Sequence, residues 1–63
     1  MPIANIQILK GRSEADRKRL IAQVTQAIID SLGVEAGQVR VVISEIDPCN
    51  WGVGGIAKSD LMR

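Results

Sequence analysis

The sequence predicts an α/β fold: a single β-α-β unit with two parallel strands and one amphipathic helix, followed by a short C-terminal hairpin and assembled as an oligomer. Three observations lead to this prediction. Apolar residues alternate over residues 3–9, recur at helical spacing over residues 14–32 and form a β-branched run over residues 39–46. A strand, helix, strand order of this length favours a right-handed crossover and therefore parallel strands. With 63 residues, the chain is expected to form one domain, residues 1–63.

The first predicted strand spans residues 3–9, with the sequence IANIQIL. Successive side chains of a strand point to opposite faces, so the apolar residues Ala4, Ile6 and Ile8 share one face. The other face is mixed in polarity, and Gly11 then breaks the run. A strand with two unequal faces is therefore expected to bury one of them against the helix that follows.

The predicted helix begins near Glu14. Ser13, followed three residues later by Asp16, resembles a capping box with the shorter acid. Gly33 is placed to end the helix in a left-handed cap. The apolar residues that recur at helical spacing, and so define an amphipathic helix, are Leu20, Ile21, Val24, Ala27, Ile28 and Leu32.

The remaining chain predicts a second strand and a hairpin. Residues 39–46 (VRVVISEI) are rich in β-branched residues, which favour strands. Residues 47–50 (DPCN) predict a turn, and residues 51–56 (WGVGGI) predict a short, irregular hairpin before a polar tail. Two parallel strands under one helix leave a sheet edge open, which favours pairing with another copy of the chain.

Composition also favours self-association. A domain of this length buries only ~60% of the surface of its unfolded chain, yet 46% of the residues are hydrophobic. Cys49 is the only cysteine, so no disulfide can form within the chain. The sequence contains no histidine and no cluster of thiols or paired carboxylates at ligand spacing, so neither a metal nor another cofactor is predicted.

Charge and hydropathy exclude two classes of partner. Eight basic and seven acidic residues are spread along the chain, giving a net charge of +1 and no extended positive field for nucleic acid. No stretch approaches the ~20 consecutive apolar residues that a membrane span needs, and the N-terminus has no secretion signal. A single cysteine fits a reducing compartment, and a cytoplasmic location is expected.

Pro2 is the most informative candidate for chemistry. A Met before proline is commonly removed, which would leave a secondary amine at the end of the chain. The free α-amino group has a pKa near ~8, and desolvation or nearby guanidinium groups would lower that pKa toward neutrality, where a base works best. The alternative is an ordinary strand start, a position where proline is tolerated.

Arg12 and Arg40 are candidates for binding a carboxylate. Arg12 lies in the turn after the first strand, where its planar guanidinium would bind a carboxylate or would be a solvated loop charge. Arg40 lies in an apolar strand, and a buried guanidinium requires a partner. That partner is a ligand carboxylate, or else a structural ion pair with Glu45 or with another subunit.

Trp51 is the only aromatic residue, and turn residues and glycines flank it. This setting suits an apolar wall of a small ligand pocket, or packing at a subunit interface. The glycines at 52, 54 and 55 lack the spacing of a phosphate loop and are assigned to backbone geometry. Cys49 has no histidine available as a base, so it is not expected to act as a nucleophile.

Four segments together resemble the 4-oxalocrotonate tautomerase family: MPIANIQIL at the start, GRS at 11–13, VRVVISEI at 39–46 and NWGVGG at 50–55. The resemblance covers almost the whole chain. It implies a homohexamer, a trimer of dimers of β-α-β subunits, whose active sites are assembled from more than one subunit. It also implies an isomerase that converts a dienol acid such as 2-hydroxymuconate, an intermediate of aromatic hydrocarbon catabolism, into its conjugated ketone.

Carried over by position, the resemblance makes Pro2 the catalytic base that removes a proton from the dienol and returns it at a remote carbon. Arg12 matches the arginine that holds the distal carboxylate, and Arg40 matches the arginine that engages the carboxylate and oxygen at the enol end. Trp51 stands where the family often has phenylalanine, so the apolar wall would be retained with a change in pocket size. Lys10 stands where an acid is expected and adds positive charge.

Two other functions compete with this prediction. A dehalogenase or hydratase relative acting on 3-haloacrylates would also use the N-terminal proline and the arginines, but it needs a carboxylate to activate water, and this chain has Val53 at the matching position. A non-catalytic oligomeric subunit would use Pro2 only as a strand start. Removal of Met1 separates the two classes, because an acylated proline nitrogen has no basic lone pair.

Overall fold

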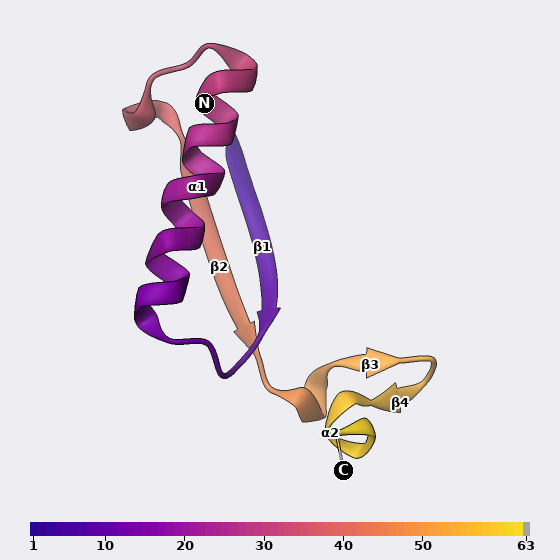
Figure 1. Cartoon of the computed structure of the whole chain (residues 1–63). Helices are drawn as coiled ribbons and strands as arrows, with labels where there is room; N and C mark the ends of the chain where they lie inside the picture. The colour runs from indigo at the N-terminus through magenta and orange to yellow at the C-terminus, as the bar shows by residue number, and fades with distance from the viewer. Residues whose placement is uncertain (63) are drawn as a thin grey trace.

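A computed structural model of the protein describes residues 1–62. Two parallel strands lie side by side under one long helix, and the chain then leaves this unit as a separate C-terminal arm (Figure 1). The elements are β1 (Ile3–Leu9), α1 (Glu14–Leu32), β2 (Arg40–Ile46), β3 (Gly52–Val53), β4 (Ile56–Ala57) and α2 (Lys58–Leu61), with 3₁₀ turns at Ala36–Gln38 and Pro48–Asn50. The predicted β-α-β unit and C-terminal hairpin are confirmed.

Helix α1 covers one face of the sheet and leaves the other face open (Figure 1). In the parallel register Ile6 lies opposite Ile43. Along most of each strand the side chains alternate between exposed and half-buried, and the half-buried ones of both strands lie on the same face. The predicted face of Ala4, Ile6 and Ile8 is the half-buried one. On the open face, Ile3 is 62% exposed.

Local interactions fix both ends of α1. The Ser13 hydroxyl accepts a hydrogen bond from the Asp16 amide at 3.1 Å, as a helix N-cap does. The Asp16 carboxylate accepts from Arg19 at 2.9 Å and not from the cap, so only half of the predicted capping box forms. Gly33 adopts φ 66°, and its amide bonds the Ile29 carbonyl at 2.9 Å, which confirms the predicted left-handed cap.

The C-terminal arm is a tight hairpin followed by a short helix. Gly54 and Gly55 both adopt positive φ, 60° and 86°, which a two-residue hairpin turn requires. The assignment of these glycines to backbone geometry is therefore confirmed. Residues 58–61 form α2 where a polar tail was predicted, and α2 packs on the 3₁₀ turn at Pro48–Asn50. One helical turn is too short for an apolar periodicity to be visible in the sequence.

The isolated chain has almost no core. Among residues 1–62 only Val39 is buried, at 8% exposed, and apolar side chains such as Leu32 and Met62 are more than half exposed. The radius of gyration is 14.7 Å, against about 11 Å for a compact domain of this length. Much of the apolar surface therefore needs a cover that a single chain does not supply.

Candidate active site

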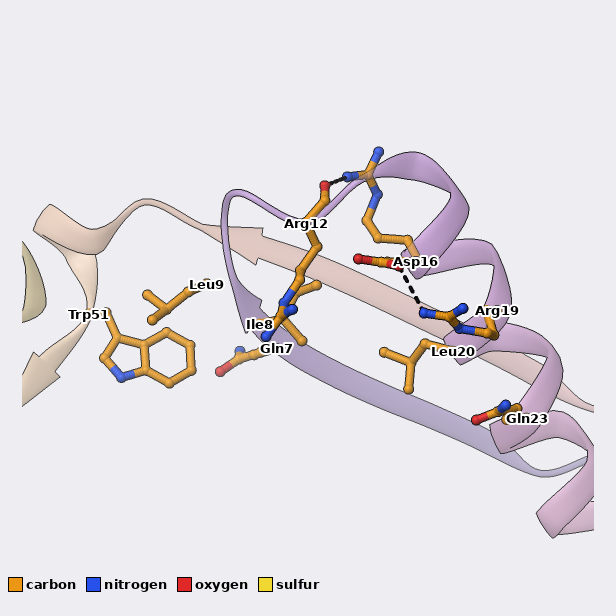
Figure 2. A pocket seen from close by; sticks show the side chains of 10 residues that line it. Gln7, Ile8, Leu9, Arg12, Asp16, Arg19, Leu20, Gln23 and Trp51 are labelled. Carbon is orange, nitrogen blue, oxygen red and sulfur yellow. Dashed lines mark hydrogen bonds and ion pairs between the residues drawn. The ribbon is translucent and has the colours of Figure 1, made fainter.

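An open hollow of about 550 Å³ lies where β1 ends and α1 begins. Figure 2 shows Trp51 on one side of it, Arg12 in the middle and the first turns of α1 on the other side. The hollow is lined by Gln7, Ile8, Leu9, Arg12, Asp16, Arg17, Arg19, Leu20, Gln23 and Trp51. Its wall thus combines apolar side chains with several charged groups, a composition that suits a small organic anion.

The parallel sheet explains why Arg12 and Trp51 line the same hollow. Parallel strands have their carboxyl ends at the same end of the sheet, so the loop after β1 and the chain after β2 leave the sheet side by side. Arg12 comes from the first of these segments and Trp51 from the second. The prediction that Trp51 walls a pocket agrees with its half-buried position in this hollow.

Arg12 differs from the other arginines of the hollow in its lack of an acidic partner. Arg17 pairs with Glu45 at 3.2 Å, and Arg19 pairs with Asp16 at 2.9 Å. Within residues 1–62, no carboxylate forms an ion pair with Arg12. A guanidinium that faces a hollow and forms no ion pair keeps its donors for an anionic ligand.

Arg40 lies at the opposite end of the sheet, beside Pro2. The Arg40 amide donates to the Pro2 carbonyl at 3.0 Å, and its guanidinium donates to the Gly37 carbonyl at 2.7 Å and the Val39 carbonyl at 3.3 Å. In the single chain this residue is exposed, and backbone carbonyls are the partners of its guanidinium. Arg40 stands on the open face of β2, where solvent reaches it.

The alternative of an ion pair between Arg40 and Glu45 is wrong. Residues 40 and 45 are an odd number of positions apart, so their side chains point to opposite faces of β2. Glu45 faces α1 and pairs with Arg17. Arg40 therefore resembles Arg12 in one respect: of the four arginines at positions 12, 17, 19 and 40, these two have no carboxylate partner within the described chain.

The candidate residues form two groups in one chain. Pro2 and Arg40 lie where the strands start, and Arg12 and Trp51 lie beyond the point where they end. β1 alone separates the groups by about 20 Å, at roughly 3.3 Å per residue. A single chain cannot bring Pro2 and Arg12 to one small molecule.

Sequence reasoning missed several residues of the hollow. Asp16, Arg19 and Gln23 recur at intervals of three and four, which places them on one side of α1 beside Arg12. That spacing was visible in the sequence, but solvated helix surfaces show it as well. Gln7 also lines the hollow, and only its place on the less apolar face of β1 could have indicated it.

Comparison with known proteins identifies the family. A family model described as "Tautomerase enzyme" matches residues 2–61. The chain belongs to the tautomerase family. Curated relatives of this tautomerase include a 2-hydroxymuconate tautomerase of Pseudomonas putida, 40% identical over 63 residues and covering 100% of both chains. A probable tautomerase of Staphylococcus aureus is 42% identical over 60 residues, covering 95% of this chain and 98% of the relative.

Solved structures agree with the assignment. A 4-oxalocrotonate tautomerase isozyme from Methylibium petroleiphilum superposes with a TM-score of 0.94 at 37% identity, covering 98% of this chain and 100% of that one. A heterohexameric 4-oxalocrotonate tautomerase from Chloroflexus aurantiacus gives a TM-score of 0.92 at 33% identity, covering 97% and 98%. The fold of this tautomerase is thus one that known enzymes use in oligomers.

The described residues offer neither a membrane-spanning helix nor a cluster of metal ligands. Across residues 1–62 no helix is both long and apolar enough to cross a bilayer. Over the same range, no group of three or more His, Cys, Asp or Glu side chains is arranged to hold a metal ion. The side chains that line the hollow carry guanidinium, carboxylate, amide, indole and aliphatic groups.

Proposed function

We propose that this tautomerase converts a dienol or enol acid of the 2-hydroxymuconate type into its keto form, with the amine of Pro2 as the catalytic base. The observation that carries the proposal is the distribution of acidic partners among the arginines. Arg12 and Arg40, which the sequence marks as carboxylate binders, are the two arginines that no carboxylate of the described chain neutralises. A substrate with an acid group at each end would supply both with a partner.

The proposed reaction moves one proton and changes no oxidation state. The Pro2 nitrogen takes the proton of the enol hydroxyl, and the electron pair shifts along the conjugated carbons as the C=O bond forms. The prolinium then returns the proton to a remote carbon, which gives the conjugated ketone. Arg40 would stabilise charge at the enol oxygen, while Arg12 would hold the distal carboxylate and draw electron density toward it.

A second copy of the chain would join the two groups of residues. One edge of β1 is unpaired in the single chain, and identical strands can pair there in antiparallel fashion. If two β1 strands pair about Ile6, Pro2 of one copy comes beside Lys10 of the other. Lys10 is two residues before Arg12, so the Pro2 of one copy and the Arg12 hollow of the other would form a single site.

Arg40 requires a further contact. By strand alternation Pro2 shares the face of Ala4, which α1 covers, whereas Arg40 stands on the open face. If the open sheet faces of different dimers pack together, the Arg40 of one dimer would reach the site that contains the Pro2 of another. We therefore propose a homohexamer of three dimers, in which every site draws on more than one subunit.

The proposed chemistry requires removal of Met1, because the nitrogen of an acylated proline is an amide and has no basic lone pair. Met1 is 77% exposed, so its peptide bond is open to an aminopeptidase before assembly. Pro2 itself is half-buried, which fits an amine that acts in a partly dry site. A cytoplasmic location is also proposed, since the free Cys49 suits a reducing compartment.

The decisive test is ultraviolet-monitored ketonisation of 2-hydroxymuconate by protein that mass spectrometry shows to begin at Pro2. Turnover is expected, and Pro2→Ala should lower kcat by roughly 10²- to 10⁴-fold, the usual contribution of a general base. A matched sample that retains Met1 should be as inactive as this variant. Absence of turnover by correctly processed oligomer would refute the proposal, and comparable release of chloride from a 3-haloacrylate would favour the dehalogenase instead.

A further inference from the structure

The loop that carries Arg12 is tied to both neighbouring elements by one side chain that the proposed reaction does not use. Arg17, in the first turns of α1, donates from Nη1 to the backbone carbonyl of Arg12 at 2.6 Å. The same nitrogen donates to Oε2 of Glu45 on β2 at 3.2 Å. Figure 2 shows the bond on the Arg12 carbonyl and the Arg12 side chain leaving in the other direction, toward Gln7 and Ile8.

This bridge is less exposed to solvent than the other ion pairs of the helix. The side chains of Arg17 and Glu45 are 29% and 31% exposed, whereas those of Lys18 and Glu14 are 73% and 76% exposed and lie 3.9 Å apart. Partial burial strengthens a charged hydrogen bond, because less water competes for its donor and acceptor. The Arg17–Glu45 bridge thus has a defined geometry that a solvated surface pair lacks.

The backbone of the loop needs such a restraint. Gly11 adopts φ 130°, a conformation that other residues rarely adopt, so the chain pivots immediately before Arg12. A hydrogen bond to the Arg12 carbonyl restrains the peptide plane between Arg12 and Ser13. It thereby restrains the direction in which the Arg12 side chain leaves the backbone. A shift of about 1 Å in a substrate-holding group can lower a rate by about 100-fold, so this direction matters for function.

Glu45 has a second effect on the hollow. Arg17 also lines it, and an unpaired guanidinium there would compete with Arg12 for the same carboxylate. The Glu45 carboxylate occupies Arg17, so Arg12 remains the arginine of the hollow that is available to a ligand. Asp16 occupies Arg19 in the same way, so the two acidic side chains together leave Arg12 as the unpaired arginine of the hollow.

We infer that Arg17, held by Glu45, is a positioning residue that aims Arg12 at the distal carboxylate of a dicarboxylate ligand. The inference rests on the proposed function for the identity of the ligand. It assigns to Arg17 and Glu45 no contact with the reacting atoms, and it predicts that the effect of Arg17 passes entirely through Arg12. A merely structural bridge between α1 and β2 would act whether Arg12 is present or not.

The test is calorimetric binding of trans,trans-muconate, a six-carbon dicarboxylate, compared with sorbate, a six-carbon diene with one carboxylate. Arg17→Met should weaken muconate binding by roughly 2- to 150-fold, the range of pairwise energies between contacting residues, and should leave sorbate binding unchanged. Arg17→Lys should recover part of the loss, since it keeps the charge beside Glu45. Lys18→Met, at the next position, is the matched control and should change neither constant.

A double-mutant comparison decides between positioning and general stability. In an Arg12→Met background, Arg17→Met should have less than about a twofold further effect on muconate binding. Hydrogen exchange of the Arg12 and Ser13 amides should accelerate in Arg17→Met and not in Lys18→Met. Additive losses, unchanged exchange, or wild-type protein that does not bind muconate would overturn the inference. Because binding and exchange need no turnover, absence of ketonisation would count against the proposed function alone.

Discussion

Replacing Arg12 by Met tests the assignment of the distal carboxylate most directly. Met keeps most of the length of the side chain and removes the guanidinium, which has no acidic partner within residues 1–62 and faces the hollow. A charge-assisted hydrogen-bonded contact contributes about 1.5–3 kcal/mol, which corresponds to roughly 10- to 150-fold in kcat/KM. Because water reaches the open hollow, the lower part of this range, roughly 10- to 30-fold, is expected.

The assay compares two dienols. On 2-hydroxymuconate, Arg12→Met should lower kcat/KM mainly through a higher KM, whereas on 2-hydroxy-2,4-pentadienoate, which lacks the distal carboxylate, the change should stay within about twofold. Arg19→Met is the control, because Arg19 lines the same hollow but is already paired with Asp16 at 2.9 Å. An equal loss on both substrates, or an equal loss in the control, would refute the assignment of Arg12.

Three further perturbations address the other parts of the molecule. Arg40→Ala should lower kcat on both dienols by roughly 10²- to 10³-fold, because both substrates have the enol end that Arg40 would contact. Steady-state kinetics on an intact oligomer measure this change, and an unchanged kcat would contradict the assignment of Arg40. Ser13→Ala should lower the free energy of unfolding by about 1 kcal/mol through loss of the cap on the Asp16 amide, whereas Ser31→Ala, in the last turn of the same helix, should not; urea unfolding at one protein concentration measures both. Val42→Asp places a charge on the open sheet face, where Val42 is 49% exposed, and should yield smaller species in sedimentation velocity, while a hexamer of unchanged stability would exclude this face from the interface.

The secondary structure of this tautomerase follows from local patterns in its sequence. Alternation over residues 3–9 and helical spacing over residues 14–32 depend on the direction of successive side chains, which neighbours along the chain determine. The caps at Ser13 and Gly33 are local for the same reason. Helix α2 was not predicted, since one turn at the end of an arm is held by packing on Pro48–Asn50 and not by periodicity.

The sequence by itself determined the elements of the β-α-β unit, the face that β1 buries and which residues are candidates for binding a carboxylate, because these depend on side-chain chemistry and local backbone geometry. Only the tertiary structure determined which charged side chains pair and which candidate residues lie together. Glu45 pairs with Arg17 and not with Arg40, because α1 lies over one face of β2. Arg12 and Trp51 line the same hollow while Pro2 lies at the far end of β1, because parallel strands place their carboxyl ends together and their starts together at the opposite end of the sheet. Such contacts join residues far apart in the chain, and no local pattern specifies them.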